Sequence, residues 1–250
     1  MYSSMTAYNE LVGHPLHNRK THGGTMNEPN YHGPVPENWE NVTLTNNYLF
    51  CKIMESEIDL CKHLIELFLH IEIDHLEIPK RKNSFMKYLD STGVLFNAIK
   101  KHTGQILNVE IQMINDEKNL SELARKHQSI IDYDDILSGL SYRNLRDTYI
   151  IFICMHDPFD KGLSVYTFES TYVTEDGHEI HLNDGSYKIF YNINESEKFP
   201  TKDKRNFFKY LKENSAEDDF TKKLEEKVQC IKADNGFKKT CIPEKETVQV

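Results

Sequence analysis

The chain has 250 residues, enough for one domain or two small ones. Hydrophobic residues make up 38% of it, below the roughly 45–50% of typical globular domains, so part of the chain is expected to lie outside a core. A net charge of −9 excludes nucleic-acid binding through overall positive charge and leaves that role to a local basic patch. No apolar run approaches the roughly 18 residues of a membrane helix, and no CxxC pair suggests a zinc ribbon. We therefore expect a cytoplasmic protein without a membrane partner.

Composition divides the chain into three segments. Residues 1–40 are rich in Asn, His, Gly and Pro and lack a helical or strand period, which predicts a disordered or loosely attached tail. Residues 41–195 carry the strongest periodic patterns and are predicted to form the core. Residues 196–250 are predicted to form C-terminal helices and a polar tail.

Within these segments, periodicity predicts both helices and strands. Apolar residues at 3–4 spacing predict four helices: 55–70, 119–138, one around Phe207, and 217–232. Gly139 ends the second of these, and His127 falls in its apolar stripe. Strand-like runs occupy 93–101, 105–113, 148–156, 165–173 and 186–193. The fold class indicated is α/β.

The run 93–113 predicts a hairpin that turns around Gly104. If the loop is centred between Thr103 and Gly104, Asn97 on the first strand lies opposite Glu110 on the second. Cross-strand neighbours have Cβ atoms about 5 Å apart, so these two side chains would share one ion or water. The alternative is a polar strand edge that faces solvent, and a register slip would separate the pair.

Five segments give the chain a resemblance to a known family: TNNYLFCKIM, GVLFNAI, GQILNVEIQ, RKHQSIIDYDDILSGLSY and YIIFICMHDPFDKGLSVYTFE. They resemble the PD-(D/E)XK nuclease family transposases, also called recombination-promoting nuclease/putative transposase proteins. The resemblance extends from about residue 44 to about residue 232. It implies a restriction-endonuclease-like core, a mixed sheet flanked by helices, with a C-terminal helical extension. It also implies metal-dependent endonucleolytic cleavage of DNA in mobile-element recombination.

The same resemblance assigns roles to four residues. Asn97, Glu110 and Gln112 fall at the catalytic positions, and Glu110, Asn97 and Asn47 at positions that hold Mg²⁺ or Mn²⁺. The family pattern has Asp where this chain has Asn97 and Asn47. Because Mg²⁺ prefers anionic oxygen ligands, this change predicts weak metal binding and impaired hydrolysis.

Three interpretations of the missing acids remain open. The chain is a natural degenerate copy, an engineered inactive copy, or a copy in which a nearby acid takes over, the candidates being Asp90, Glu55 and Glu57. The alternative function is a non-catalytic DNA-binding or regulatory homologue that pairs with active family members.

Candidate DNA contacts come from polar and basic residues near the predicted site. They are Lys52, Arg125, Lys126, His127 and Gln128, with the basic segment 79–84 as a second patch. The expected partner is double-stranded DNA, bound weakly and with strong dependence on salt, and a homo-oligomer is a second possible assembly.

Overall fold

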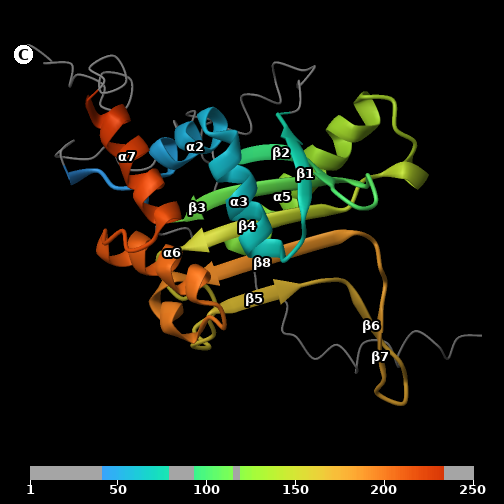
Figure 1. The fold of residues 1–250 in the computed structure, drawn as a ribbon. Helices are drawn as coiled ribbons and strands as arrows, with labels where there is room; N and C mark the ends of the chain where they lie inside the picture. Colours follow the sequence, from blue (N-terminus) through green and yellow to red (C-terminus); the bar gives the residue numbers. More distant parts are fainter. Residues whose placement is uncertain (1–40, 79–92, 115–118, 234–250) are drawn as a thin grey trace, which may run out of the picture. The chain divides into compact units, whose positions relative to one another are not determined.

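The structure is a computed structural model in which residues 41–78, 93–114 and 119–233 are described. They form a mixed α/β fold with a six-stranded mixed sheet flanked by helices (Figure 1), so the predicted α/β class is confirmed. None of the helices in the described ranges is both long and apolar enough to cross a bilayer. The predicted N-terminal and C-terminal tails, the basic segment 79–84 and Asp90 lie outside the described residues.

The helices are α2 (Asn47–Ser56), α3 (Ile58–Leu69), α5 (Leu120–Leu137), α6 (Lys202–Glu213) and α7 (Asp219–Ala233), with short 3-10 helices η2 (Tyr142–Asn144) and η3 (Ile193–Lys198). The strands are β1 (Ile73–Glu77), β2 (Val94–Lys100), β3 (Ile106–Ile114), β4 (Thr148–Cys154), β5 (Val165–Phe168), β6 (Thr171–Val173), β7 (Glu179–His181) and β8 (Ser186–Asn192).

The helix predicted over 55–70 is confirmed as α3, and a further helix that was not predicted, α2, precedes it. α2 begins earlier, because the side chain of Asn46 accepts a hydrogen bond from Leu49 N at 3.0 Å and caps the first turn. Glu57 has non-helical angles (φ −115°, ψ 69°) and separates α2 from α3. Phe50 and Ile53 of α2 are fully buried, so the buried apolar residues of this region begin before residue 55, where the predicted helix starts.

The main sheet has the strand order β1-β2-β3-β4-β8-β5. β1, β2 and β3 are antiparallel neighbours, β3, β4 and β8 run parallel, and β5 is antiparallel to β8. β5 and β8 lie within the strand-like runs predicted at 165–173 and 186–193. β6 instead pairs with β7 in a separate two-stranded sheet.

The predicted register of the β2–β3 hairpin is wrong. Asn97 lies opposite Asn108, and Leu95 lies opposite Glu110. The loop runs from Lys101 to Gly104, and Gly104 (φ 65°) is its last residue rather than its centre. The centre of the loop therefore lies one residue earlier than predicted, which moves each cross-strand partner by two positions and leaves every side chain on its predicted face.

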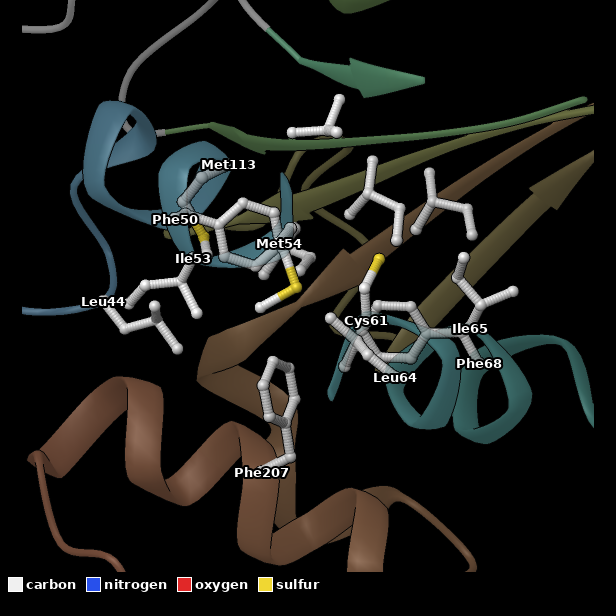
Figure 2. Packing of buried hydrophobic residues seen from close by; sticks show 14 of the residues in the cluster. Leu44, Phe50, Ile53, Met54, Cys61, Leu64, Ile65, Phe68, Met113 and Phe207 are labelled. Atoms are coloured by element: carbon white, nitrogen blue, oxygen red, sulfur yellow. The ribbon is translucent and has the colours of Figure 1, made fainter. Parts of the chain in front are cut away.

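Each face of the sheet packs against a different set of helices. The side of β3 that carries Leu107, Val109, Ile111 and Met113 joins the main core with α2, α3, α6 and α7. Figure 2 shows Phe50 and Met113 next to each other within this core. The opposite side joins a smaller core with α5, which includes Phe152 and Phe190.

The C-terminal helices share the main core instead of forming a separate layer. Phe207 and Phe208 of α6, with Leu224 and Val228 of α7, belong to the same buried cluster as the sheet and α3. Figure 2 places Phe207 beneath the α2 and α3 side chains. The described part of the segment predicted as a C-terminal extension, up to residue 233, therefore packs onto the core that was predicted over 41–195.

Lys204 of α6 is a charged residue enclosed by this core. It is 4% exposed, its ammonium lies 5.2 Å from the centre of the Tyr191 ring, and its Nζ is 3.2 Å from His70 Nε2. Burial lowers the pKa of Lys204 from its ordinary 10.5 to about 8.

We predict that Lys204 makes stability rise with pH in the alkaline range. Between about pH 8 and about pH 10 the unfolded chain binds a proton at this side chain that the folded chain has released, so the free energy of unfolding should increase with pH. Lys204→Met should remove this rise and be more stable than the natural chain near pH 7. Urea unfolding of both proteins across that range tests this, and parallel pH profiles would contradict it.

Candidate active-site cluster on strand β3

Three polar side chains of β3 point toward α5 and are buried. Asn108, Glu110 and Gln112 are 1%, 2% and 6% exposed, and they alternate with the apolar residues of the opposite face. The alternative of a solvent-facing polar strand edge is therefore wrong. Buried polar groups need partners, and the partners here come mainly from α5.

Glu110 is in direct contact with His127. The Oε1 of Glu110 and the Nδ1 of His127 form an ion pair in which neither side chain is more than 2% exposed. Gly93 closes the other side, since a Cβ atom there would stand 2.7 Å from Glu110 Oε1. The carboxylate is thus enclosed between a glycine backbone and an imidazole.

A second polar contact joins β3 to α5 two turns further along the helix. Asn108 Nδ2 donates to Asp135 Oδ2 at 2.9 Å, and Arg146 Nη1 donates to Asp135 Oδ1 at 3.2 Å. Asp135 is 5% exposed, and the two donors compensate for burying its charge. No sequence motif predicts the roles of Asn108, Asp135 and Arg146.

Gln112 has an acceptor without a partner among the described residues. Its Oε1 is buried and accepts no hydrogen bond there. An unsatisfied buried carbonyl oxygen costs about 1–3 kcal/mol. This oxygen, on the same face of β3 as Glu110, is therefore available to a water or another ligand.

Asn97 lies on the same face of the sheet as Glu110 but diagonally from it. It is half-buried, with Asn108 opposite on β3 and Glu77 opposite on β1. Diagonal neighbours are about 7–8 Å apart, so the two side chains do not form the directly opposed pair that the sequence predicted.

Asn47 performs a structural role at the first turn of α2. Its Oδ1 accepts a hydrogen bond from Met113 N at 3.0 Å. β2 pairs with β3 only as far as Ile111, so this amide lies beyond the last β2 partner. Asn47 therefore joins α2 to the end of β3, and the oxygen expected to bind metal is already an acceptor.

Glu55 and Glu57, the described acids that were candidates to replace the missing aspartates, differ in their surroundings. Glu57 is held by Lys227 of α7, with 2.8 Å between Oε1 and Nζ. Glu55 is exposed on α2 and lies near Cys51. Burial raises the pKa of the Cys51 thiol, and the charges of Glu55 and then Glu110 add to that rise.

The five predicted DNA contacts do not form one surface. Lys52 is exposed on α2, and Arg125 and Lys126 are exposed on α5. Gln128 is half-buried and binds Asp132 and Ser186. His127 is fully buried against Glu110, so its assignment to DNA is wrong. Successive helix residues point about 100° apart, and the position of His127 follows the apolar stripe of α5, whereas Arg125 and Lys126 face solvent.

The donor set around Glu110 does not fit a Mg²⁺ or Mn²⁺ site of the kind that the resemblance implies. Mg²⁺ requires oxygen ligands in near-octahedral geometry. Of the expected ligands, only Glu110 carries charge, and its Oε1 contacts His127. Asn47 Oδ1 serves Met113 N, and Asn97 stands one diagonal step away. Comparison of the chain with protein-family models, curated proteins and solved structures gives no match.

We predict that Glu110 and His127 are strongly coupled. His127→Leu leaves a buried carboxylate without its partner and should reduce the free energy of unfolding by about 3–5 kcal/mol. The double variant Glu110→Leu/His127→Leu should be less destabilised than the sum of the single variants, with a coupling energy of about 1–3 kcal/mol. Urea unfolding of the four proteins completes the cycle. Additive effects would show that the contact contributes no energy.

Proposed function

We propose that this chain is a PD-(D/E)XK-type DNA endonuclease/putative transposase of mobile-element recombination, which binds double-stranded DNA and whose phosphodiester hydrolysis is strongly impaired. The single observation that carries the proposal is the buried polar face of β3. Glu110 and Gln112 stand there in the order Glu-x-Gln, with Asn97 on the same face of the neighbouring strand. The mixed sheet between two helical layers is compatible with this core.

The proposed impairment follows from charge. A family-type site would hold several carboxylates, whereas here one carboxylate remains and its Oε1 contacts His127. The proposed roles of the chain's own residues are limited to two. Glu110 would accept a proton or a cation only after separating from His127, and the Gln112 carbonyl oxygen would orient a water molecule.

A second candidate is a non-catalytic homologue that binds DNA or pairs with an active family member. The contact between Glu110 and His127 favours it, because that contact occupies an oxygen of the one carboxylate that remains at the site. Exposed apolar residues on the β6–β7 hairpin and the segment that follows it, among them Tyr172, Ile180 and Leu182, offer a surface for such pairing or for a homo-oligomer.

We predict that restoring the acids increases plasmid nicking. Asn97→Asp with Asn47→Asp should nick supercoiled plasmid in Mg²⁺ or Mn²⁺ at least about tenfold faster than the natural chain, which corresponds to about 1.4 kcal/mol in the barrier. The carboxylate that replaces the Asn47 amide would still accept the hydrogen bond from Met113 N. Adding Glu110→Ala should abolish the gain.

Asn194→Asp is the matched control for the nicking experiment. It makes the same chemical change at an exposed position in η3 and should leave nicking unaltered. Activity that survives Glu110→Ala would refute the proposed site. No nicking by any variant, together with retained DNA binding, would favour the non-catalytic candidate.

We predict that DNA binding depends on the exposed cations of α5. Arg125→Glu with Lys126→Glu should weaken binding to a duplex about tenfold or more in low salt and flatten the dependence of affinity on salt. Lys222→Glu with Lys223→Glu on α7 is the matched double charge reversal. Fluorescence anisotropy with a labelled duplex measures both, and equal losses in the two variants would mean that α5 has no specific role.

A further inference from the structure

A pocket of about 480 Å³ lies between α5 and the β5–β8 edge of the sheet, apart from the Glu110 cluster. This volume is within the range of small-molecule sites. Phenylalanine rings line it together with Lys188 of β8, the cross-strand neighbour of Phe168, and a polar face of α5 completes the lining.

The aromatic wall consists of Phe159, Phe168 and Phe190. The three ring centres are 5.0 to 5.6 Å apart in every pair. Phe190 is buried, whereas Phe168 is 45% exposed. A large aromatic ring left this exposed beside a pocket offers a flat apolar surface on which a planar group can stack.

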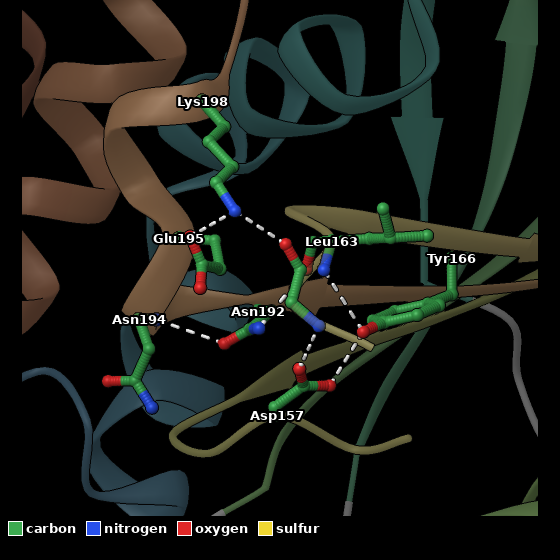
Figure 3. A network of polar contacts seen from close by, with 8 residues as sticks. Asp157, Leu163, Tyr166, Asn192, Asn194, Glu195 and Lys198 are labelled. Atoms are coloured by element: carbon green, nitrogen blue, oxygen red, sulfur yellow. Dashed lines mark hydrogen bonds and ion pairs between the residues drawn. The ribbon is translucent and has the colours of Figure 1, made fainter. Parts of the chain in front are cut away.

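Several hydrogen bonds hold the loop that presents Phe159. Asp157 accepts hydrogen bonds from Gly162 N at 2.7 Å, from the Tyr166 hydroxyl at 2.7 Å and from Phe159 N at 3.1 Å. Lys198 Nζ donates to Gly162 O at 2.6 Å. Figure 3 shows Asp157 and Lys198 joined to this loop from opposite sides. The aromatic wall is thus formed before any ligand arrives.

A connected polar network joins α5 to β8 beside these rings. Gln128 Nε2 donates to Asp132 Oδ1 at 2.9 Å, and Gln128 Oε1 accepts from Ser186 Oγ at 2.7 Å. Lys188 Nζ donates in turn to Ser186 Oγ. Arg125 lies one turn before Gln128 and also lines the pocket. A ligand here meets two cations and one carboxylate together with aromatic rings.

Burial raises the pKa of the Asp132 carboxyl, an effect that the Gln128 hydrogen bond and Lys188 oppose. A purely hydrocarbon ligand would exclude water from Asp132 and Lys188 without replacing the hydrogen bonds that the water makes to them. A planar ligand with N–H donors on its edge and an anionic group satisfies all three features of the pocket. A nucleotide has this chemistry, since bases stack on aromatic rings and phosphate binds Arg and Lys.

The sheet fixes the distance between this pocket and the Glu110 cluster. Glu110, Ile150 and Lys188 are direct neighbours across β3, β4 and β8, and Gln112, Phe152 and Phe190 form the next row. The two sites therefore lie on the same face, two strands or about 10 Å apart. This is about three stacked nucleotides of one DNA strand.

We propose that this pocket binds a single unstacked nucleotide, with its base against Phe168 and its phosphate near Arg125 and Lys188. Two sources have this chemistry, a free nucleotide and an unpaired nucleotide in a DNA strand. The second source rests on the proposed DNA function, and the first does not.

The test measures dissociation constants by calorimetry for dAMP and inorganic phosphate, and by anisotropy for a duplex with one bulged adenine and the same duplex fully paired. dAMP should bind saturably and more tightly than phosphate. Phe168→Ala and, separately, Arg125→Gln should weaken dAMP binding about tenfold. Tyr172→Ala, which removes a comparably exposed aromatic ring from β6, should leave it unchanged.

The outcomes separate the two sources and the two proposals. A preference of about tenfold for the bulged duplex that Phe168→Ala removes identifies a DNA strand as the source, and dAMP binding without that preference identifies a free nucleotide. dAMP binding no tighter than phosphate, or equal losses in Phe168→Ala and Tyr172→Ala, overturns the pocket. Duplex binding without dAMP binding supports the proposed DNA function and overturns the proposed pocket. Binding of dAMP without duplex binding supports the pocket and overturns the DNA function.

Discussion

A carboxylate buried against an imidazole determines how the sheet and α5 fit together. Glu110 is 2% exposed, and taking an isolated carboxylate out of water is so unfavourable that a partner is required. His127 is that partner, and its position fixes the rotation of α5 about its axis. Gln128 then faces the β8 side, and Asp135, two turns further on, meets Asn108.

The rotation of α5 also decides what each basic residue near the site can do. With His127 directed into the sheet, Arg125 borders the pocket and Lys126 points to solvent. Four consecutive residues that look like one basic cluster in the sequence are therefore divided among an interior contact, a pocket wall and an exposed surface. DNA contacts by this helix would come from Arg125 and Lys126, and not from His127.

The faces of the strands were predictable from the sequence, whereas their register was not. Strict alternation along residues 106–114 assigns Asn108, Glu110 and Gln112 to one side, and the structure agrees. The register depended on which loop residue adopts a positive φ, and Gly104 does so at the end of the loop and not at its centre. The burial of His127 had a visible signal in the apolar spacing of its helix. No sequence pattern predicts the role of Asp135, which depends on how α5 packs against β3, or those of Lys188 and Phe190, which depend on parallel pairing between strands far apart in the chain.

Glu110 contacts His127 in the folded chain, and the orientation of α5 on the sheet depends on this contact. Long-range ¹H–¹⁵N NMR of the histidine side chains tests it, because a hydrogen-bonded Nδ1 carries a proton with a distinctive, slowly exchanging signal. The account predicts such a proton on His127 in the natural protein and its loss or a large shift in Glu110→Gln. A His127 Nδ1 without a proton, or a signal that Glu110→Gln leaves unchanged, would contradict it.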